Sequence, residues 1–282
     1  MRRTVNINDV NKPIVEKLYS TIWGRAILKV LTRPSVSNFV GFILDRKISK
    51  CFISNFIKNN NIDMEQYVKR EYFSFNDFFT REKIESEKQV DFRDDAFISP
   101  CDASLSVYKI QDNSSFKIKS VNYSVVSLLE NEELADEYID GLCLVFRLSV
   151  DDYHRYCYLD NGKKSDNVHI DGILHTVQPI AVVNDLALVK NTREYTCLYT
   201  ENFDKIVQIE IGALLVGRIK NYHSAVHFFK GEEKGMFEYG GSTIVLLVKK
   251  DVLALDGEIF ENTCKDLETK VKYGEAIGFR IK

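Results

Sequence analysis

The sequence predicts an α+β fold, with a helical N-terminal, membrane-facing part followed by a β-rich body of mostly antiparallel strands. Near the N-terminus, apolar residues recur in pairs about four residues apart, as on one face of a helix. Later segments are β-branched, partly alternating and separated by Gly, Asn and Asp turns. Because helices and strands fall in separate blocks, we divide the chain into residues 1–90 and residues 91–282.

The helical part is expected to contain two helices, over 14–31 and 36–57, with Pro34 as the break between them. Residues 1–50 hold ten basic and three acidic residues, a net charge of +7, which leaves −10 for the rest of the chain. A basic amphipathic element predicts contact with an anionic lipid surface, with Trp23 near the headgroups. The same pattern is equally expected of helices that only pack on the body.

The body is expected to be built from strands. The four clearest strand segments are 142–150, 206–219, 242–248 and 274–281. At 282 residues the chain is long enough to bury a large core without disulfides or a structural metal. Its six cysteines form no CxxC pair, and no apolar run approaches the length of a spanning helix. We expect a soluble or peripheral protein on the cytoplasmic side, without a nucleic-acid partner.

Residues 240–243, GGST, lie immediately before the apolar strand segment. The motif is not the GxSxG turn of α/β-hydrolases, because a strand follows it. It also lacks the GKS/T of a phosphate-binding loop. Taken alone, GGST predicts no more than a turn.

Further motifs in the chain give GGST a more specific interpretation than a turn. In chain order they are FFTRE (78–82), SPCDAS (99–104), DDYHRY (151–156), NTRE (191–194), IEIGALLVGRI (209–219) and KGEEKGMFEYGGST (230–243). Together they resemble the proenzymes of the pyruvoyl-dependent phosphatidylserine decarboxylases of prokaryotic type. The resemblance runs from about residue 14 to the C-terminus.

The resemblance implies self-cleavage between Gly241 and Ser242, giving a β chain of residues 1–241 and an α chain of residues 242–282. Glycines allow the bent backbone in which Ser242 Oγ attacks the preceding carbonyl. Ser242 would then become a covalent pyruvoyl cofactor. The expected activity is conversion of phosphatidylserine to phosphatidylethanolamine and CO2 through a Schiff base on that group, with no metal.

The resemblance also assigns candidate catalytic residues. Activation of a serine hydroxyl needs a base and an orienting carboxylate, and the family motifs place these at His154 and Asp102. The sequence departs from the family where a second histidine is usual, since Cys157 stands there. It departs again at Ala103, which replaces a glycine.

Other polar residues have weaker assignments. Glu233 and Gly235 match a family element that would shape the approach to the cleavage bond. Arg81 and Arg193 could bind a carboxylate or phosphate, or form structural ion pairs. His169 and His175 are expected to be structural. His223 and His227 could share a helical face as metal ligands, but no Cys or carboxylate motif completes a site, and we expect none.

The partners implied are an anionic phospholipid membrane, the phosphatidylserine substrate, the two cleavage fragments as a heterodimer, and a second copy of the chain. The expected location is the cytoplasmic side of the cell membrane, as a peripheral protein. Two other functions fit the residues. One is a non-processed, membrane-associated β-barrel or sandwich binding module, and the other is a Ser-His-Asp lipid hydrolase.

Overall fold

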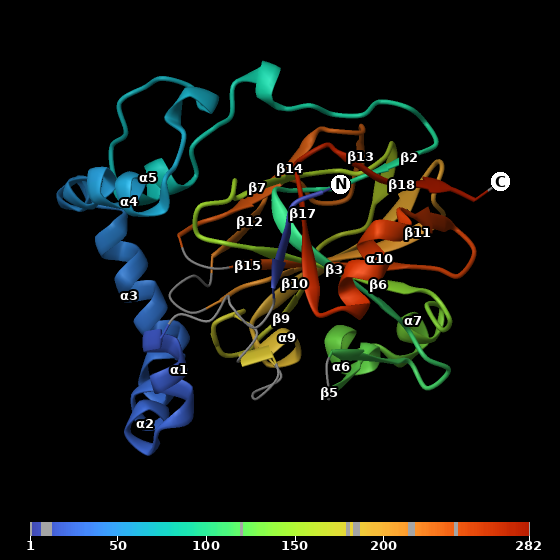
Figure 1. The fold of residues 1–282 in the computed structure, drawn as a ribbon, viewed down its shortest axis with the longest axis horizontal. Coiled ribbons are helices and arrows are strands. Elements are labelled where there is room, and N and C mark those ends of the chain that lie inside the picture. Colours follow the sequence, from blue (N-terminus) through green and yellow to red (C-terminus); the bar gives the residue numbers. More distant parts are fainter. Residues whose placement is uncertain are drawn as a thin grey trace.

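The computed structural model describes residues 2–6, 13–118, 121–178, 181–182, 187–213, 218–239 and 242–281. Figure 1 shows a body of sheets, with helices from the N-terminal part of the chain along one side. All pairings between named strands of the described residues are antiparallel. The predicted α+β class is therefore confirmed.

Ten strands of the described residues form the main sheet, in the order β1-β17-β3-β6-β15-β11-β10-β8-β13, with β9 also paired to β10. Their bounds are β1 Thr4–Asn6, β17 Leu267–Val271, β3 Ala103–Lys109, β6 Leu142–Leu148, β15 Ser242–Val248, β11 Lys205–Ile211, β10 Arg193–Thr200, β8 Gly162–Lys164, β13 Val226–Phe228 and β9 Val168–Ile170. Strand β15 lies inside this sheet, between β6 and β11.

Smaller sheets complete the described part of the body. The small sheet β12-β14-β7 contains β12 Ile219–Asn221, β14 Glu233–Phe237 and β7 Arg155–Cys157. A second sheet contains β16 Leu253–Leu255, β18 Ala276–Arg280 and β2 Ala96–Ile98, and a hairpin pairs β4 Ser115–Ile118 with β5 Val121–Ser124.

The central strands β6 and β15 are buried on both faces of the main sheet, which explains why they are apolar at successive positions rather than strictly alternating. On β15, Ile244 and Leu246 face a core shared with the small sheet, which contributes Tyr156 and Phe237. Val245 on the opposite face belongs to a core that includes α6. The helices of the described residues beside the body are α6 Val125–Leu129, α7 Glu132–Asp136, α9 Ala187–Lys190 and α10 Gly257–Cys264.

The expected strand segments are found with changed bounds. Segment 242–248 matches β15, and 142–150 and 274–281 are shortened to β6 and β18. The prediction of one strand over 206–219 is wrong, because β11 ends at Ile211 and β12 begins at Ile219. The two strands belong to different sheets.

The N-terminal part is helical, but the two long helices predicted there are each broken. The helices are α1 Pro13–Ser20, α2 Ile22–Leu31, α3 Pro34–Leu44, α4 Ile53–Asn60 and α5 Phe75–Phe79, with 3₁₀ turns at Lys47–Phe52, Met64–Gln66 and Glu85–Glu87. Thr21 ends α1 and begins α2, because its hydroxyl caps the Gly24 N–H at 3.0 Å. A Cβ on Gly24 would lie 2.5 Å from the Leu18 carbonyl oxygen, so this glycine permits the close turn.

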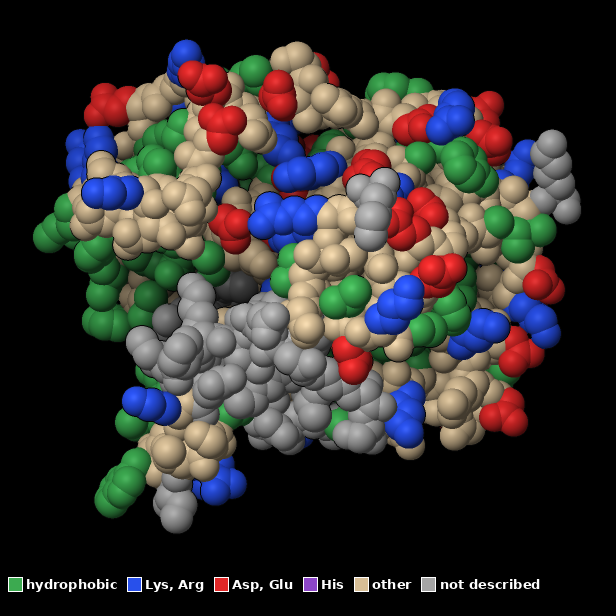
Figure 2. Space-filling view, in the orientation of Figure 1, with side chains coloured by type: hydrophobic (Ala, Val, Ile, Leu, Met, Phe, Trp, Pro, Cys, Tyr) green, Lys and Arg blue, Asp and Glu red, His purple; other side chains and the backbone are tan. Residues whose placement is uncertain are grey.

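Apolar side chains are exposed on this helical part, and Figure 2 shows them as green atoms along its outer edge. Trp23 on α2 is 83% exposed, Phe39 on α3 is 65% exposed and Ile48 in the following turn is 76% exposed. No single helix of the described residues has the length and apolar character needed to cross a membrane. Residues 23–31 and 35–44 together meet that criterion, but they are bent by 69° relative to each other.

The helical part contacts the body at several points. Tyr19 Oη lies 2.9 Å from His175 Nδ1, the Leu174 N–H donates to the Thr32 carbonyl, and Arg218 pairs with Asp45 at 2.8 Å. Residues 4–6 before the helices also form β1, which pairs with β17 of the main sheet. The proposed division at residue 90 therefore describes a change in secondary structure, while the two parts share a sheet.

Candidate active site

Three adjacent strands bring the candidate catalytic residues to one end of the main sheet. Ser242 is the first residue of β15 and lies opposite Leu148, the last residue of β6. Asp102 directly precedes β3, which pairs with the other side of β6. Neighbouring strands are about 4.8 Å apart, so the backbones of β3 and β15 are separated by about 10 Å. The turn that contains His154 follows β6 at this same end.

Ser242 is fully buried, and its Oγ has no hydrogen-bond partner among the described residues. Leaving a buried hydroxyl unpaired costs about 1–3 kcal/mol. The Oγ atoms of Ser104 and Ser106 on β3 are also buried and unpaired, so this feature fits a functional role for Ser242 but is not specific to it. Later conversion of the serine to another group would be such a role. Gly240 and Gly241, which include the other side of the predicted cleavage bond, lie outside the described residues.

His154 is buried, and its ring packs against Phe79 with the ring centroids 4.2 Å apart. Its Nδ1 lies 2.9 Å from the backbone carbonyl oxygen of Asp152. Because a carbonyl oxygen only accepts, Nδ1 donates in this contact and carries the hydrogen. The neutral ring then presents Nε2 as the nitrogen that can take a proton.

The segment that leads to Ser242 is held beside His154. The Phe237 N–H donates to the His154 carbonyl at 2.9 Å, and the Tyr239 N–H donates to Asn76 Oδ1 at 2.9 Å. The Tyr239 ring also meets Phe79 edge to face, with centroids 5.1 Å apart. Helix α5, capped by the Ser74 side chain, therefore touches both the histidine and the approach to the cleavage bond.

Asp102 is buried in contact with a lysine that lies outside the motifs quoted from the sequence. Lys83 Nζ lies 2.6 Å from Asp102 Oδ2, and the Tyr273 N–H donates to Oδ1 at 2.8 Å. Burial raises the pKa of the Asp102 carboxyl, but the charges of Lys83 and Lys272 and these hydrogen bonds outweigh burial and hold that pKa below its ordinary value. Asp102 is thus kept ionised.

Among the described residues, no hydrogen bond joins Asp102 to His154, and none joins His154 to Ser242 Oγ. The structure therefore brings the three residues to one end of the sheet without a preformed Ser-His-Asp chain. Their catalytic roles remain predictions. Lys83 directly follows the FFTRE motif and could have been considered from sequence, whereas no pattern indicated Tyr273.

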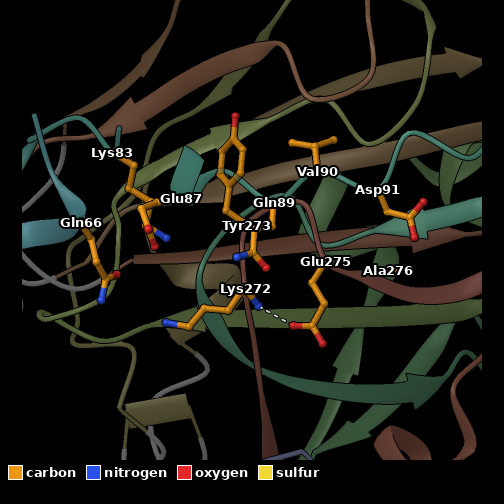
Figure 3. A pocket seen from close by; sticks show the side chains of 10 residues that line it. All are labelled: Gln66, Lys83, Glu87, Gln89, Val90, Asp91, Lys272, Tyr273, Glu275 and Ala276. Carbon is orange, nitrogen blue, oxygen red and sulfur yellow. Dashed lines mark hydrogen bonds between the residues drawn. The ribbon is translucent and has the colours of Figure 1, made fainter. Parts of the chain in front are cut away.

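A pocket of about 620 Å³ is lined by residues that contact Asp102. Figure 3 shows Lys83, Lys272 and Tyr273 among the side chains that line it. The other lining residues are Gln66, Glu87, Gln89, Val90, Asp91, Glu275 and Ala276. Because Lys83 and Tyr273 both contact Asp102, the pocket borders the candidate site.

Cys157 occupies the position where the family usually has a second histidine, and its environment excludes a role as a base near neutral pH. The residue is fully buried in β7. Burial raises the pKa of its thiol to about 12, so the group stays protonated. Ala103, the other departure, is buried at the start of β3 and pairs with Val271.

The guanidinium groups of the two candidate arginines donate hydrogen bonds to backbone carbonyls of the fold. Arg193 is buried and donates to the carbonyls of Leu128 and Ser127, at 2.8 Å and 2.9 Å. Arg81 is also buried and donates to the Asp151 carbonyl at 3.1 Å, with its guanidinium 4.4 Å from the centre of the Tyr67 ring. Both therefore act as structural contacts here.

The structure also gives the contacts or positions of the other residues proposed from the sequence. Glu233 accepts from Arg155 at 2.9 Å, and a Cβ on Gly235 would lie 2.3 Å from the Lys220 carbonyl oxygen. His223 and His227 do not share a helical face, because they lie in the loop after β12 and in β13. Within the described residues, no group of three or more His, Cys, Asp or Glu side chains is arranged to hold a metal.

An α+β body with a buried serine at the start of a central strand, and with a carboxylate and an imidazole at the same end of the sheet, fits a self-processing enzyme. The family model described as phosphatidylserine decarboxylase matches residues 75–279. The chain is 47% identical over 262 residues to phosphatidylserine decarboxylase proenzyme 2 of Clostridium acetobutylicum, covering 93% of this chain and 90% of that protein.

Two further relatives carry the name phosphatidylserine decarboxylase proenzyme. One, from Clostridium perfringens, is 38% identical over 92% of this chain and 90% of its own length. Another, from the Kyoto strain of Clostridium botulinum, is 36% identical over 98% of this chain and 97% of its own length. The chain belongs to the phosphatidylserine decarboxylase family. The expected enzyme class, a carboxy-lyase with a covalent pyruvoyl group, is confirmed.

Replacing Asp102 with asparagine leaves the Lys83 ammonium buried without its counter-charge, which we expect to cost about 3–5 kcal/mol of unfolding free energy. Because the pKa of Asp102 is lower in the fold than in the unfolded chain, its carboxylate stabilises the fold above about pH 4. This contribution is lost as the pH falls through the folded-state pKa. Thermal unfolding of both proteins from about pH 8 to about pH 3 should show their difference narrowing below about pH 4.

The double variant Lys83→Met/Asp102→Asn serves as the control, because it removes both charges and should recover most of the lost stability. A difference between wild type and Asp102→Asn that stays constant over the pH series would contradict the ionised state of Asp102.

Proposed function

We propose that this chain forms its active site by cleaving itself at Gly241–Ser242. It is a phosphatidylserine decarboxylase, which converts phosphatidylserine to phosphatidylethanolamine. Family membership supports the reaction. The observation that carries the site assignment is the position of Ser242, buried at the start of a central strand, at the end of the sheet where Asp102 and His154 also lie. Ser242 is the nucleophile of the cleavage and the precursor of the cofactor. The pyruvoyl group supplies an electron sink for loss of the substrate carboxylate.

In this proposal His154 moves the proton. Its Nδ1 hydrogen is held by the Asp152 carbonyl, which leaves Nε2 as the accepting atom, and Phe79 fixes the ring plane. Cys157 stays neutral and does not compete for the proton. Asp102 is kept ionised by Lys83 and Lys272 and is present as a carboxylate at the same end of the sheet.

The two cleavage products are expected to remain together as a heterodimer. The residues that would form the α chain begin with β15, which pairs with β6 on one side and β11 on the other. They also include β17, paired with β1 and β3, and β18, paired with β2. Each of these strands of the smaller fragment therefore pairs with at least one strand of the larger fragment.

We further propose that the helical part docks on the cytoplasmic face of an anionic membrane. Exposed apolar side chains on α2 and α3 lie beside exposed Arg25, Lys29 and Arg33, the combination that binds an anionic lipid surface. Helix α5, which belongs to this helical part, contacts Tyr239, three residues before Ser242. A membrane on this face would place lipid headgroups near the site.

The two other functions considered from sequence have less support. A non-processed binding module does not account for membership of a decarboxylase family. A conventional lipid hydrolase would use a Ser-His-Asp chain, and its hydrogen bonds are not formed among the described residues. Homo-oligomer formation stays a prediction from the family resemblance.

Ser242→Ala should give one uncut chain that releases no CO2 from phosphatidylserine, because both the nucleophile and the cofactor precursor are lost. Denaturing gels and intact mass should show wild type as two fragments, the shorter beginning at residue 242 with a blocked N-terminus. Ser106→Ala, at a buried serine of β3, is the matched control and should still be cut. Cleavage of Ser242→Ala at the same bond would refute the assignment.

Replacement of His154 and Cys157 separates the two possible positions of the base. We expect His154→Ala to slow self-cleavage by about 10²–10⁴-fold, the usual contribution of a general base. Cys157→Ala should be cut at close to the wild-type rate, because the thiol is neutral. Pulse-chase gels give both rates. Unimpaired cleavage of His154→Ala would move the base to another residue, such as His169 or His175.

Membrane docking can be followed through Trp23, the single tryptophan of the chain. Anionic vesicles containing phosphatidylserine should shift its emission to the blue. Basic residues near such a surface contribute about 1 kcal/mol each, so Arg25→Glu/Lys29→Glu should weaken vesicle binding by about 30-fold or more. The control Lys163→Glu/Lys250→Glu makes the same charge change on the body. Equal weakening by both double variants would contradict docking through α2.

A further inference from the structure

A fully buried ion pair joins the main sheet to the small sheet. Lys234 Nζ on β14 lies 2.7 Å from Glu210 Oε1 on β11, and neither side chain is exposed. Burying two charges is costly, and such a pair is often no more stabilising than apolar residues of the same size. Stability alone is therefore a weak reason for its presence.

The pair is the centre of a set of hydrogen-bonded side chains that we call the interlayer cluster. Its members are Glu194 on β10, Gln208 and Glu210 on β11, Asn221 on β12, and Lys234 on β14. Glu194 and Glu210 lie directly opposite each other on neighbouring strands, where like charges repel. Asn221 Nδ2 donates to both, at 2.8 Å and 3.3 Å, and Asn221 Oδ1 accepts from Lys234 Nζ at 2.7 Å.

The interlayer cluster lies close to Ser242 on the same face of the main sheet. Glu210 is opposite Ile244 in the β11–β15 pair, and Ser242 is two residues before Ile244. Side chains two positions apart on a strand share a face, so Ser242 is a diagonal neighbour of Glu210, about 7–8 Å away.

The small sheet carries both elements that must meet Ser242. His154 directly precedes β7, and β14 leads through residues 238–241 into Ser242. Tyr156 of β7 also donates to Asn221 Oδ1 at 3.3 Å. All three strands of the small sheet thus contact the interlayer cluster.

Apolar contacts also join the two layers, through Tyr156, Phe237 and Ile244. These contacts are not directional and allow one layer to slide over the other. Hydrogen bonds between buried charges have strict geometry, and they can select one arrangement among several of similar energy.

We propose that Lys234 and Glu210 are positioning residues, which fix the small sheet over the main sheet so that His154 and the chain before Ser242 are correctly placed for self-cleavage. They act through the placement of β7 and β14 and do not touch the reacting atoms. This inference rests on the proposed self-cleavage at Ser242.

The test separates positioning from stability. Lys234→Met leaves Glu210 buried without its partner, so both the melting temperature and the cleavage rate should fall. Glu210→Gln/Lys234→Met removes both charges and should recover most of the melting temperature. Its cleavage should remain about 10–100-fold slower than wild type, because small misplacements have effects of this size. Gels of freshly translated full-length chain give the rates.

Lys230→Met is the matched control. Lys230 is also a buried lysine on the segment leading into β14, but its ammonium donates to the carbonyls of Arg93 and Ala96, outside the interlayer cluster. It should lower the melting temperature and leave the cleavage rate close to wild type.

Two results would overturn the positioning role. One is cleavage of the double variant at the wild-type rate once its stability has recovered. The other is equal slowing by Lys230→Met at an equal loss of melting temperature. An uncut wild-type chain would instead refute the underlying self-cleavage, and cleavage of Ser242→Ala would refute the role of Ser242. The failures are therefore distinguishable.

Discussion

The pairing of β15 on both of its sides is the constraint on which the other features depend. Its backbone groups bond to β6 and β11, and its side chains are buried on both faces. A shift of this strand by one residue would turn every side chain to the opposite face of the sheet. Residues of one core would then lie in the other, so the register is fixed. Ser242, as its first residue, therefore has a fixed position, and the groups that act on it must be brought to it by other elements.

Those elements come from three parts of the chain. The start of β3 brings Asp102, the turn after β6 brings His154, and β14 brings the chain that ends at Ser242. Each is fixed by a different interaction: an ion pair with Lys83, a ring contact with Phe79, and the interlayer cluster. Electrostatics, aromatic packing and buried hydrogen bonding thus meet at one end of one sheet.

Much of this arrangement could be predicted from the sequence, because it depends on local patterns. The apolar run 242–248 predicted a buried strand, and the separate helix and strand blocks predicted α+β. The break at Thr21 could not be predicted, since a threonine within a helix and a threonine that caps the next helix fit the same periodicity. The Lys83–Asp102 pair depends on tertiary contact between separate segments, and no spacing rule indicates it.

Strand β1 attaches the N-terminal end of the helical part to the main sheet. The chain enters the main sheet at residues 4–6 and leaves it to form the helices. It then passes through β2, in the sheet β16-β18-β2, and returns to the main sheet at β3. The helical part is therefore a loop closed at both ends rather than a free N-terminal arm. Its range of movement is limited by two anchors, and the first anchor is made against β17, within the last sixteen residues of the chain. Removing the N-terminus would thus expose an edge of the sheet as well as remove a membrane contact.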